Sequence, residues 1–171
     1  MALDIRAQRF GYAVFEASPV KLLDWGVRSM RMDGARRGAW HIADLLRMYQ
    51  PSAVVFRRIK AGGRRDTPGA RNITHAIKCE ARRNAVPVAL VGKSALKIFF
   101  REYGKHTKHE IASALAAVFA ELKWKLPPPR RLKFWRGEAR RMSVFDAAAL
   151  GIAFLALHGY GDAVRELLVN K

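Results

Sequence analysis

Short apolar runs open the chain, and each has the length and composition of a β-strand. The first, Met1–Ile5, carries one acid, Asp4, within an otherwise apolar stretch. Phe10–Phe15 is rich in aromatic and β-branched residues, and Val20–Met30 has a similar character, so both are predicted strands. Because only short links separate these runs, we expect them to pair as an antiparallel meander.

The rest of the chain alternates between helical spacing of apolar residues and further short apolar runs. Helices are predicted over Ala35–Gln50, Ala70–Asn84, Ser94–Tyr103, Lys108–Leu122, Ser143–Leu157 and Tyr160–Val169. The intervening runs Ala53–Phe56 and Val86–Val91 are predicted strands. Strands separated by helices join a sheet in parallel through right-handed crossovers. The pattern therefore predicts an α/β fold, a mixed five-stranded sheet of a three-strand antiparallel meander plus two parallel strands, with helices on both faces.

Asp4 is the most informative polar residue of the predicted sheet. A carboxylate inside a central strand is costly unless it has a partner, a metal ion or a shifted pKa. An alternative is that Asp4 lies at a frayed strand end and pairs with Arg6 or Arg9. Asp4 is therefore a candidate site residue whose role depends on its surroundings.

Charge changes the interpretation of this fold. The 171 residues fit one domain, 1–171, and carry a net charge of +18. A field of this strength favours a polyanionic partner, most commonly nucleic acid, with an anionic membrane or an acidic protein as the rival. No uninterrupted apolar run near the length of a membrane span is evident, so no spanning helix is expected, and no membrane is included among the predicted partners. The single cysteine, Cys79, and the lack of a signal-peptide pattern favour the cytoplasm.

Cations cluster in loops and at the ends of predicted elements. The stretch 123–141 is predicted to be irregular, and Trp135 lies there among arginines and a lysine, a mixture suited to stacking on nucleic acid. The candidate nucleic-acid-binding residues are Arg6, Arg9, Arg57, Arg58, Lys60, Arg64, Arg65, Arg71, Lys105, Lys108, Arg130, Arg131, Lys133, Trp135 and Arg136.

The order of these elements and several of their sequences resemble one known family. The opening ALDIRAQRFGYAVFE is similar to the first hairpin of RuvC-type Holliday-junction resolvases, members of the ribonuclease H-like superfamily. The resemblance continues in Pro51–Phe56 as the fourth strand, in Lys108–Leu122, and in Phe145–Ala153 as the alanine-rich last helix. It covers about 155 residues and implies a ribonuclease H-like fold.

The resemblance also implies a chemistry. These enzymes hydrolyse a phosphodiester with two Mg²⁺ ions held by four acids. Asp4 matches the acid of the first strand, and Asp146 matches one of the pair on the last helix. Arg57 stands where the family has its second acid, and the companion of Asp146 falls at Ser143 or Ala149. The implied catalytic residues are thus Asp4 and Asp146, which would hold Mg²⁺ (or Mn²⁺).

Further acids could supply a missing metal ligand. Glu138, just before the last helix, is the preferred candidate, ahead of Glu80 and Glu110. Arg57 would repel a metal ion, and it could instead hold a phosphate or pair with the acids. Asp146 also has a purely structural alternative, because Ser143–Asp146 has the pattern of a capping box.

The sequence therefore leaves two interpretations open. One is a RuvC-like protein that binds branched or duplex DNA, four-way junctions among them, with metal-dependent cleavage from an incomplete acidic site. The other is a non-catalytic basic protein on the same fold that binds nucleic acid or acts as an adaptor. Cleavage, the choice between DNA and RNA, and a homodimer remain open at this stage.

Overall fold

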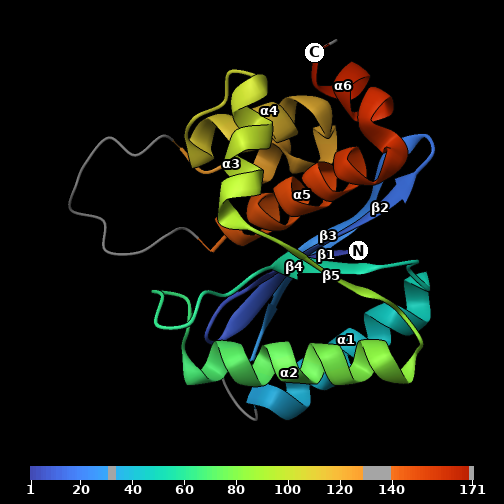
Figure 1. Ribbon diagram of the computed structural model, residues 1–171, viewed down its shortest axis with the longest axis vertical. Coiled ribbons are helices and arrows are strands. Elements are labelled where there is room, and N and C mark those ends of the chain that lie inside the picture. Colours follow the sequence, from blue (N-terminus) through green and yellow to red (C-terminus); the bar gives the residue numbers. More distant parts are fainter. Residues whose placement is uncertain (31–33, 129–139, 170–171) are drawn as a thin grey trace.

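A five-stranded mixed sheet forms the middle layer of the computed structural model, which describes residues 1–30, 34–128 and 140–169. Its strands are β1 (Ala2–Ile5), β2 (Arg9–Ala17), β3 (Val20–Ser29), β4 (Val54–Arg57) and β5 (Val88–Val91). The spatial order is β3-β2-β1-β4-β5, with antiparallel pairing among the first three and parallel pairing of β4 with β1 and β5. The predicted sheet is confirmed, and β1 is its central strand (Figure 1).

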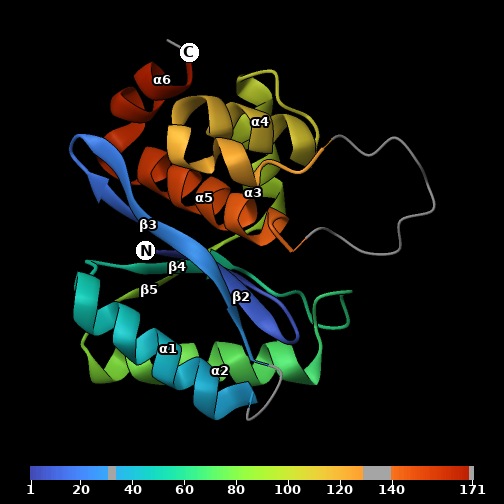
Figure 2. The ribbon, with the colours of Figure 1, turned by 180° about the vertical axis from the view of Figure 1, so that it is seen from behind.

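Helices cover both faces of this sheet (Figures 1 and 2). On one face lie α1 (Gly34–Tyr49) and α2 (Pro68–Arg83). The other face carries α3 (Lys93–Glu102), α4 (Lys108–Val118), α5 (Met142–Leu155) and α6 (Gly161–Val169), with the short helices η1 (Ala120–Lys125) and η2 (Ala156–Tyr160). The helix predicted to reach Leu122 ends earlier, because Phe119 is extended and the chain continues as the 3₁₀ helix η1.

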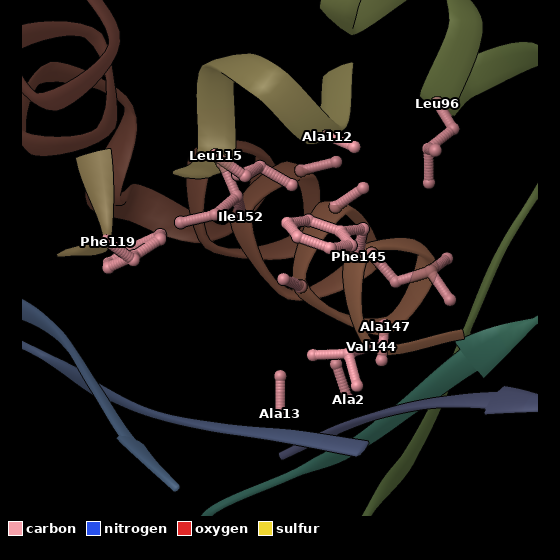
Figure 3. Close-up of a cluster of buried hydrophobic side chains, with 14 of the residues drawn as sticks. Ala2, Ala13, Leu96, Ala112, Leu115, Phe119, Val144, Phe145, Ala147 and Ile152 are labelled. Atoms are coloured by element: carbon pink, nitrogen blue, oxygen red, sulfur yellow. The ribbon is translucent and has the colours of Figure 1, made fainter. Parts of the chain in front are cut away.

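Alternation along the central strand divides the core in two. Leu3 and Ile5 point to the cluster under α1 and α2, whereas Ala2 points to α5. On the α5 side the middle of the sheet carries the small residues Ala2 and Ala13, so the alanine-rich helix can lie close against it there. Figure 3 shows Ala2 and Ala13 of the sheet facing Val144 and Ala147 of α5. Strand alternation therefore places every second residue of β1, including Asp4, on the side of α5.

The final helical stretch, Met142–Val169, is apolar and long enough to cross a membrane by length and composition. The sequence pattern did not predict this, because polar residues interrupt the apolar run. Two-thirds of the apolar window is buried inside the protein, and α5 is buried at every position from Met142 to Ala153. The backbone also departs from helical geometry at His158 and Gly159. The apolar character of α5 is thus accounted for by its place between the sheet and the outer helices.

Candidate functional site

Asp4 is fully buried on the central strand β1, opposite Gly11 of β2. Its carboxylate accepts a hydrogen bond from Arg6 Nε at 2.7 Å and another from Arg65 Nη1 at 2.5 Å. The expectation of a frayed strand end is wrong, since the position has no exposed surface, but the expected pairing with Arg6 is present. Burial of this carboxylate is therefore compensated by two guanidinium groups.

Asp146 reaches the same place from the first half of α5. Its Oδ2 accepts hydrogen bonds from Arg6 Nη2 at 2.6 Å and Lys108 Nζ at 2.8 Å, and a longer one from Arg65 Nη2 at 3.4 Å. The capping-box alternative is wrong. The helix begins at Met142, so Ser143 is already helical, and its buried hydroxyl has no hydrogen-bond partner among the described residues.

The structure thus brings together two acids and three cations, which we call the Asp4–Asp146 cluster: Asp4, Asp146, Arg6, Arg65 and Lys108. Two guanidinium groups, those of Arg6 and Arg65, each donate to both carboxylates. The carboxylate oxygens concerned are consequently within about 8 Å of each other, the span of two hydrogen bonds and a guanidinium. Acids separated by more than 140 residues meet as the resemblance implied, but with cations between them.

Each cation of the cluster is positioned by local structure. Arg6 follows the end of β1, two residues after Asp4. Lys108 is the first residue of α4, and its place is fixed by a capping box in which Thr107 and Glu110 bond each other's backbone N–H groups. The N–H groups of His106 and Thr107 hold the pKa of Glu110 below its usual range. Glu110 is therefore committed to the cap rather than to a metal site.

Arg65 comes from the loop 58–67 between β4 and α2. Asp66 organises this loop by accepting hydrogen bonds from the Gly62 N–H at 2.9 Å and from Arg71 at 2.8 Å. The same two donors, the Gly62 N–H first, lower the pKa of Asp66. Arg71, a predicted nucleic-acid-binding residue, is thus an internal partner of the loop as well as an exposed cation.

Arg57 ends β4 and faces the same side as Val55. Ala2 pairs with Val55 and Leu3 with Phe56, so continuing this parallel register places Arg57 beside Asp4. Its Nε is buried and has no hydrogen-bond partner in the described part of the chain. Burial, followed by the charge of Arg65, lowers the pKa of Arg57, while Asp146 and Asp4 oppose that shift. The alternative in which Arg57 itself pairs with the two acids is therefore wrong.

The described residues do not fit the pair of Mg²⁺ ions that the resemblance implied. Among them, no group of three His, Cys, Asp or Glu side chains is placed to hold a metal ion. Both carboxylates of the cluster already accept hydrogen bonds from cations, and Glu80 pairs with Arg83 at 2.5 Å. Glu138 lies outside the described residues. Among the described residues, Asp4 and Asp146 are the only acids of this cluster, and a metal ion would have to displace guanidinium groups from them.

The remaining predicted cations surround this cluster unevenly. Arg58, Lys60 and Arg64 are exposed on the loop 58–67, which projects beside the carboxyl end of β4 (Figure 1). Arg9 and Lys105 are half-buried. Arg130, Arg131, Lys133, Trp135 and Arg136 lie outside the described residues. Sequence reasoning missed one point: Arg65 and Lys108 were predicted only to bind nucleic acid, and their pairing with Asp4 and Asp146 became visible only in three dimensions.

Solved structures of the same fold give the comparison. This chain matches T. thermophilus RuvC in complex with a Holliday junction substrate at a TM-score of 0.65, with 18% identity over 93% of this chain and 94% of that chain. A Fowlpox virus resolvase in complex with Holliday junction DNA matches at 0.59, with 15% identity over 91% and 97%. The yeast mitochondrial Holliday junction resolvase matches at 0.64, with 14% identity over 96% and 79%.

These similarities lie in three-dimensional structure rather than in sequence. No family model matches the chain, and no curated protein sequence is detectably similar to it. The matches nevertheless cover more than nine-tenths of the chain at TM-scores of 0.59 to 0.65. The chain therefore has a divergent RuvC-like fold of the ribonuclease H-like class.

Proposed function

We propose that this protein binds branched DNA through a RuvC-like fold and does not cleave it. The observation that carries the proposal is the Asp4–Asp146 cluster, in which basic side chains of the protein hold the two carboxylates. A metal-dependent nuclease needs those carboxylates free to bind Mg²⁺. Here both are neutralised within the fold, one of them with no exposed surface.

Cations and metal ions differ in what they offer a phosphodiester. A guanidinium or ammonium group donates hydrogen bonds to phosphate oxygens and supplies positive charge. It does not lower the pKa of a bound water to generate a nucleophile at neutral pH, as a metal ion does. The cluster therefore suits binding of the DNA backbone without hydrolysis.

The surroundings of the cluster support a nucleic-acid partner. Exposed cations of the loop 58–67 lie next to it, and the whole chain carries a net charge of +18. The structures of two proteins with this fold contain Holliday junctions, which makes a four-way junction the first substrate to test. Phosphate contacts of this kind give affinity without base specificity.

Fluorescence anisotropy with a labelled four-way junction tests the proposal. We expect tight binding at low salt, with log K falling by about 0.9 per phosphate contact for each unit of log salt. Lys60→Glu and Arg64→Glu should weaken binding of every sequence tested, because both side chains are exposed beside the cluster. Arg82→Glu is the matched control, since Arg82 is exposed near the far end of α2.

The same assay separates the rival partner. Anionic vesicles are added as a competitor of the labelled junction. Vesicles that displace the junction completely at equal anion concentration would reject the proposal and favour a basic adaptor for acidic surfaces. A salt slope near zero would reject the electrostatic basis of the proposal.

A further inference from the structure

Arg57 differs from the other cations around the two acids. Arg6, Arg65 and Lys108 all form ion pairs with Asp4 or Asp146. Arg57 is half-buried at the carboxyl end of β4, and none of the ion pairs among the described residues includes it. Its Nε is buried and has no hydrogen-bond partner in the described part of the chain. A partly buried guanidinium with an unsatisfied Nε is costly, so this position calls for an explanation.

The surroundings of Arg57 show which ligand would compensate it. The nearby carboxylates of Asp4 and Asp146 form ion pairs with other cations, and Arg65 places a further positive charge near Arg57. Burial and this neighbouring charge depress the pKa of Arg57, as expected for a cation that lacks a counter-ion. An anion entering from the exposed loop side would relieve both effects.

We propose that the Arg57 guanidinium binds one backbone phosphate of the DNA, at the strand end beside Asp4. This assignment rests on the proposed function and names the contact within it. The guanidinium is planar and can donate two parallel N–H hydrogen bonds, a geometry that matches two oxygens of a phosphodiester. The two acids of the cluster then act as positioning residues. They do not bind the phosphate themselves but hold Arg6, Arg65 and Lys108 around it.

A cycle of protein and DNA changes tests this contact directly. Each phosphate near the branch point is replaced in turn by an uncharged methylphosphonate, and anisotropy measures binding to wild type, Arg57→Gln and Arg58→Gln. At one position we expect the methylphosphonate to weaken wild-type binding about tenfold but to leave Arg57→Gln unaffected. Arg58→Gln removes the same charge one residue later on an exposed side chain, so its effect should add to that of the methylphosphonate.

The same series of measurements includes two controls, one for the charge at position 57 and one for binding of free inorganic phosphate. Arg57→Lys keeps the charge and should recover part of the salt slope that Arg57→Gln loses, about 0.9 for one contact. Additive effects at every phosphate position would overturn the assignment while leaving junction binding, and hence the proposed function, intact. Failure of wild type to bind the junction would instead reject the proposed function itself. Inorganic phosphate that displaces no junction but raises the Tm of wild type alone would assign Arg57 to a free anion and overturn the DNA contact.

Discussion

The guanidinium of Arg6 lies 2.6 Å from the carboxylate of Asp146, a residue 140 positions later in the chain. The same guanidinium contacts Asp4 on the central strand, so it joins the sheet to α5 through the two acids. Arg65 contacts the same two carboxylates, which are therefore partners of the protein's own cations.

Removing the buried carboxylate should destabilise the protein. Asp4→Asn removes the buried one of the two carboxylates that Arg6 and Arg65 share, and breaking a buried pair costs about 3–5 kcal/mol. Urea denaturation measures the loss. Asp44→Asn is the control, because its pair with the exposed Arg47 contributes about 1 kcal/mol or less. A gain in stability for Asp4→Asn would show that the carboxylate is held against repulsion, as in a metal site.

Arg57→Met should have the opposite effect on stability. The change removes a half-buried cation whose Nε has no hydrogen-bond partner among the described residues, and it keeps a side chain of similar length, so we expect the free energy of unfolding to rise by about 1–3 kcal/mol. Arg58→Met on the exposed neighbour should change it by about 0.5 kcal/mol or less. Denaturation of Arg57→Met at a lower urea concentration than wild type would mean that Arg57 has a stabilising partner within the fold.

Gly11→Ala tests the close approach of the sheet to α5. A Cβ at Gly11 would lie 2.2 Å from the carbonyl oxygen of Ser143, a backbone atom that has no rotamer to change. We expect the free energy of unfolding to fall by about 1–3 kcal/mol or more, because the start of α5 must move away from β2, where Gly11 lies opposite Asp4. Thermal melts of Gly11→Ala and wild type measure this loss. Gly92→Ala is the control and should be nearly neutral, because its Cβ would meet nothing closer than 3.8 Å.

Tyr12 gives a prediction about alkaline pH. Burial, and then the charge of Asp24, raise its pKa to about 12 from an ordinary value of 10.0. The folded state therefore retains the phenolic proton where the unfolded chain loses it. The stability from Tyr12 should be fully present below pH 10 and disappear progressively as the pH rises to about 12. Tyr12→Phe should flatten that decline in stability and remove one late-titrating phenol from the absorbance titration.

Much of the fold could be predicted because its signals are local. Short apolar runs defined the strands, and strands separated by helices implied parallel pairing. Helix ends were less accurate. α5 begins at Met142, and its Ser143 backbone lies close against Gly11 of the sheet, a contact that is not visible in the sequence around Ser143.

The site was only half predictable, for the same reason. The resemblance to a family pointed to Asp4 and Asp146, and strand alternation explains why Asp4 faces α5. The cations that hold these acids come from three different segments, and Arg65 belongs to a loop whose course depends on Asp66. Charge alone assigned Arg65 and Lys108 to the partner's phosphates, whereas packing shows that they first satisfy the protein's own carboxylates.

Cleavage under single-turnover conditions tests the central claim most directly. A labelled four-way junction is saturated with excess protein, binding is verified by anisotropy, and Mg²⁺ or Mn²⁺ is then added. We predict that the junction stays bound and uncut with either metal, because Arg6, Arg65 and Lys108 occupy the carboxylates that would hold it. Site-specific cuts that require the metal and disappear in both Asp4→Asn and Asp146→Asn would contradict the account.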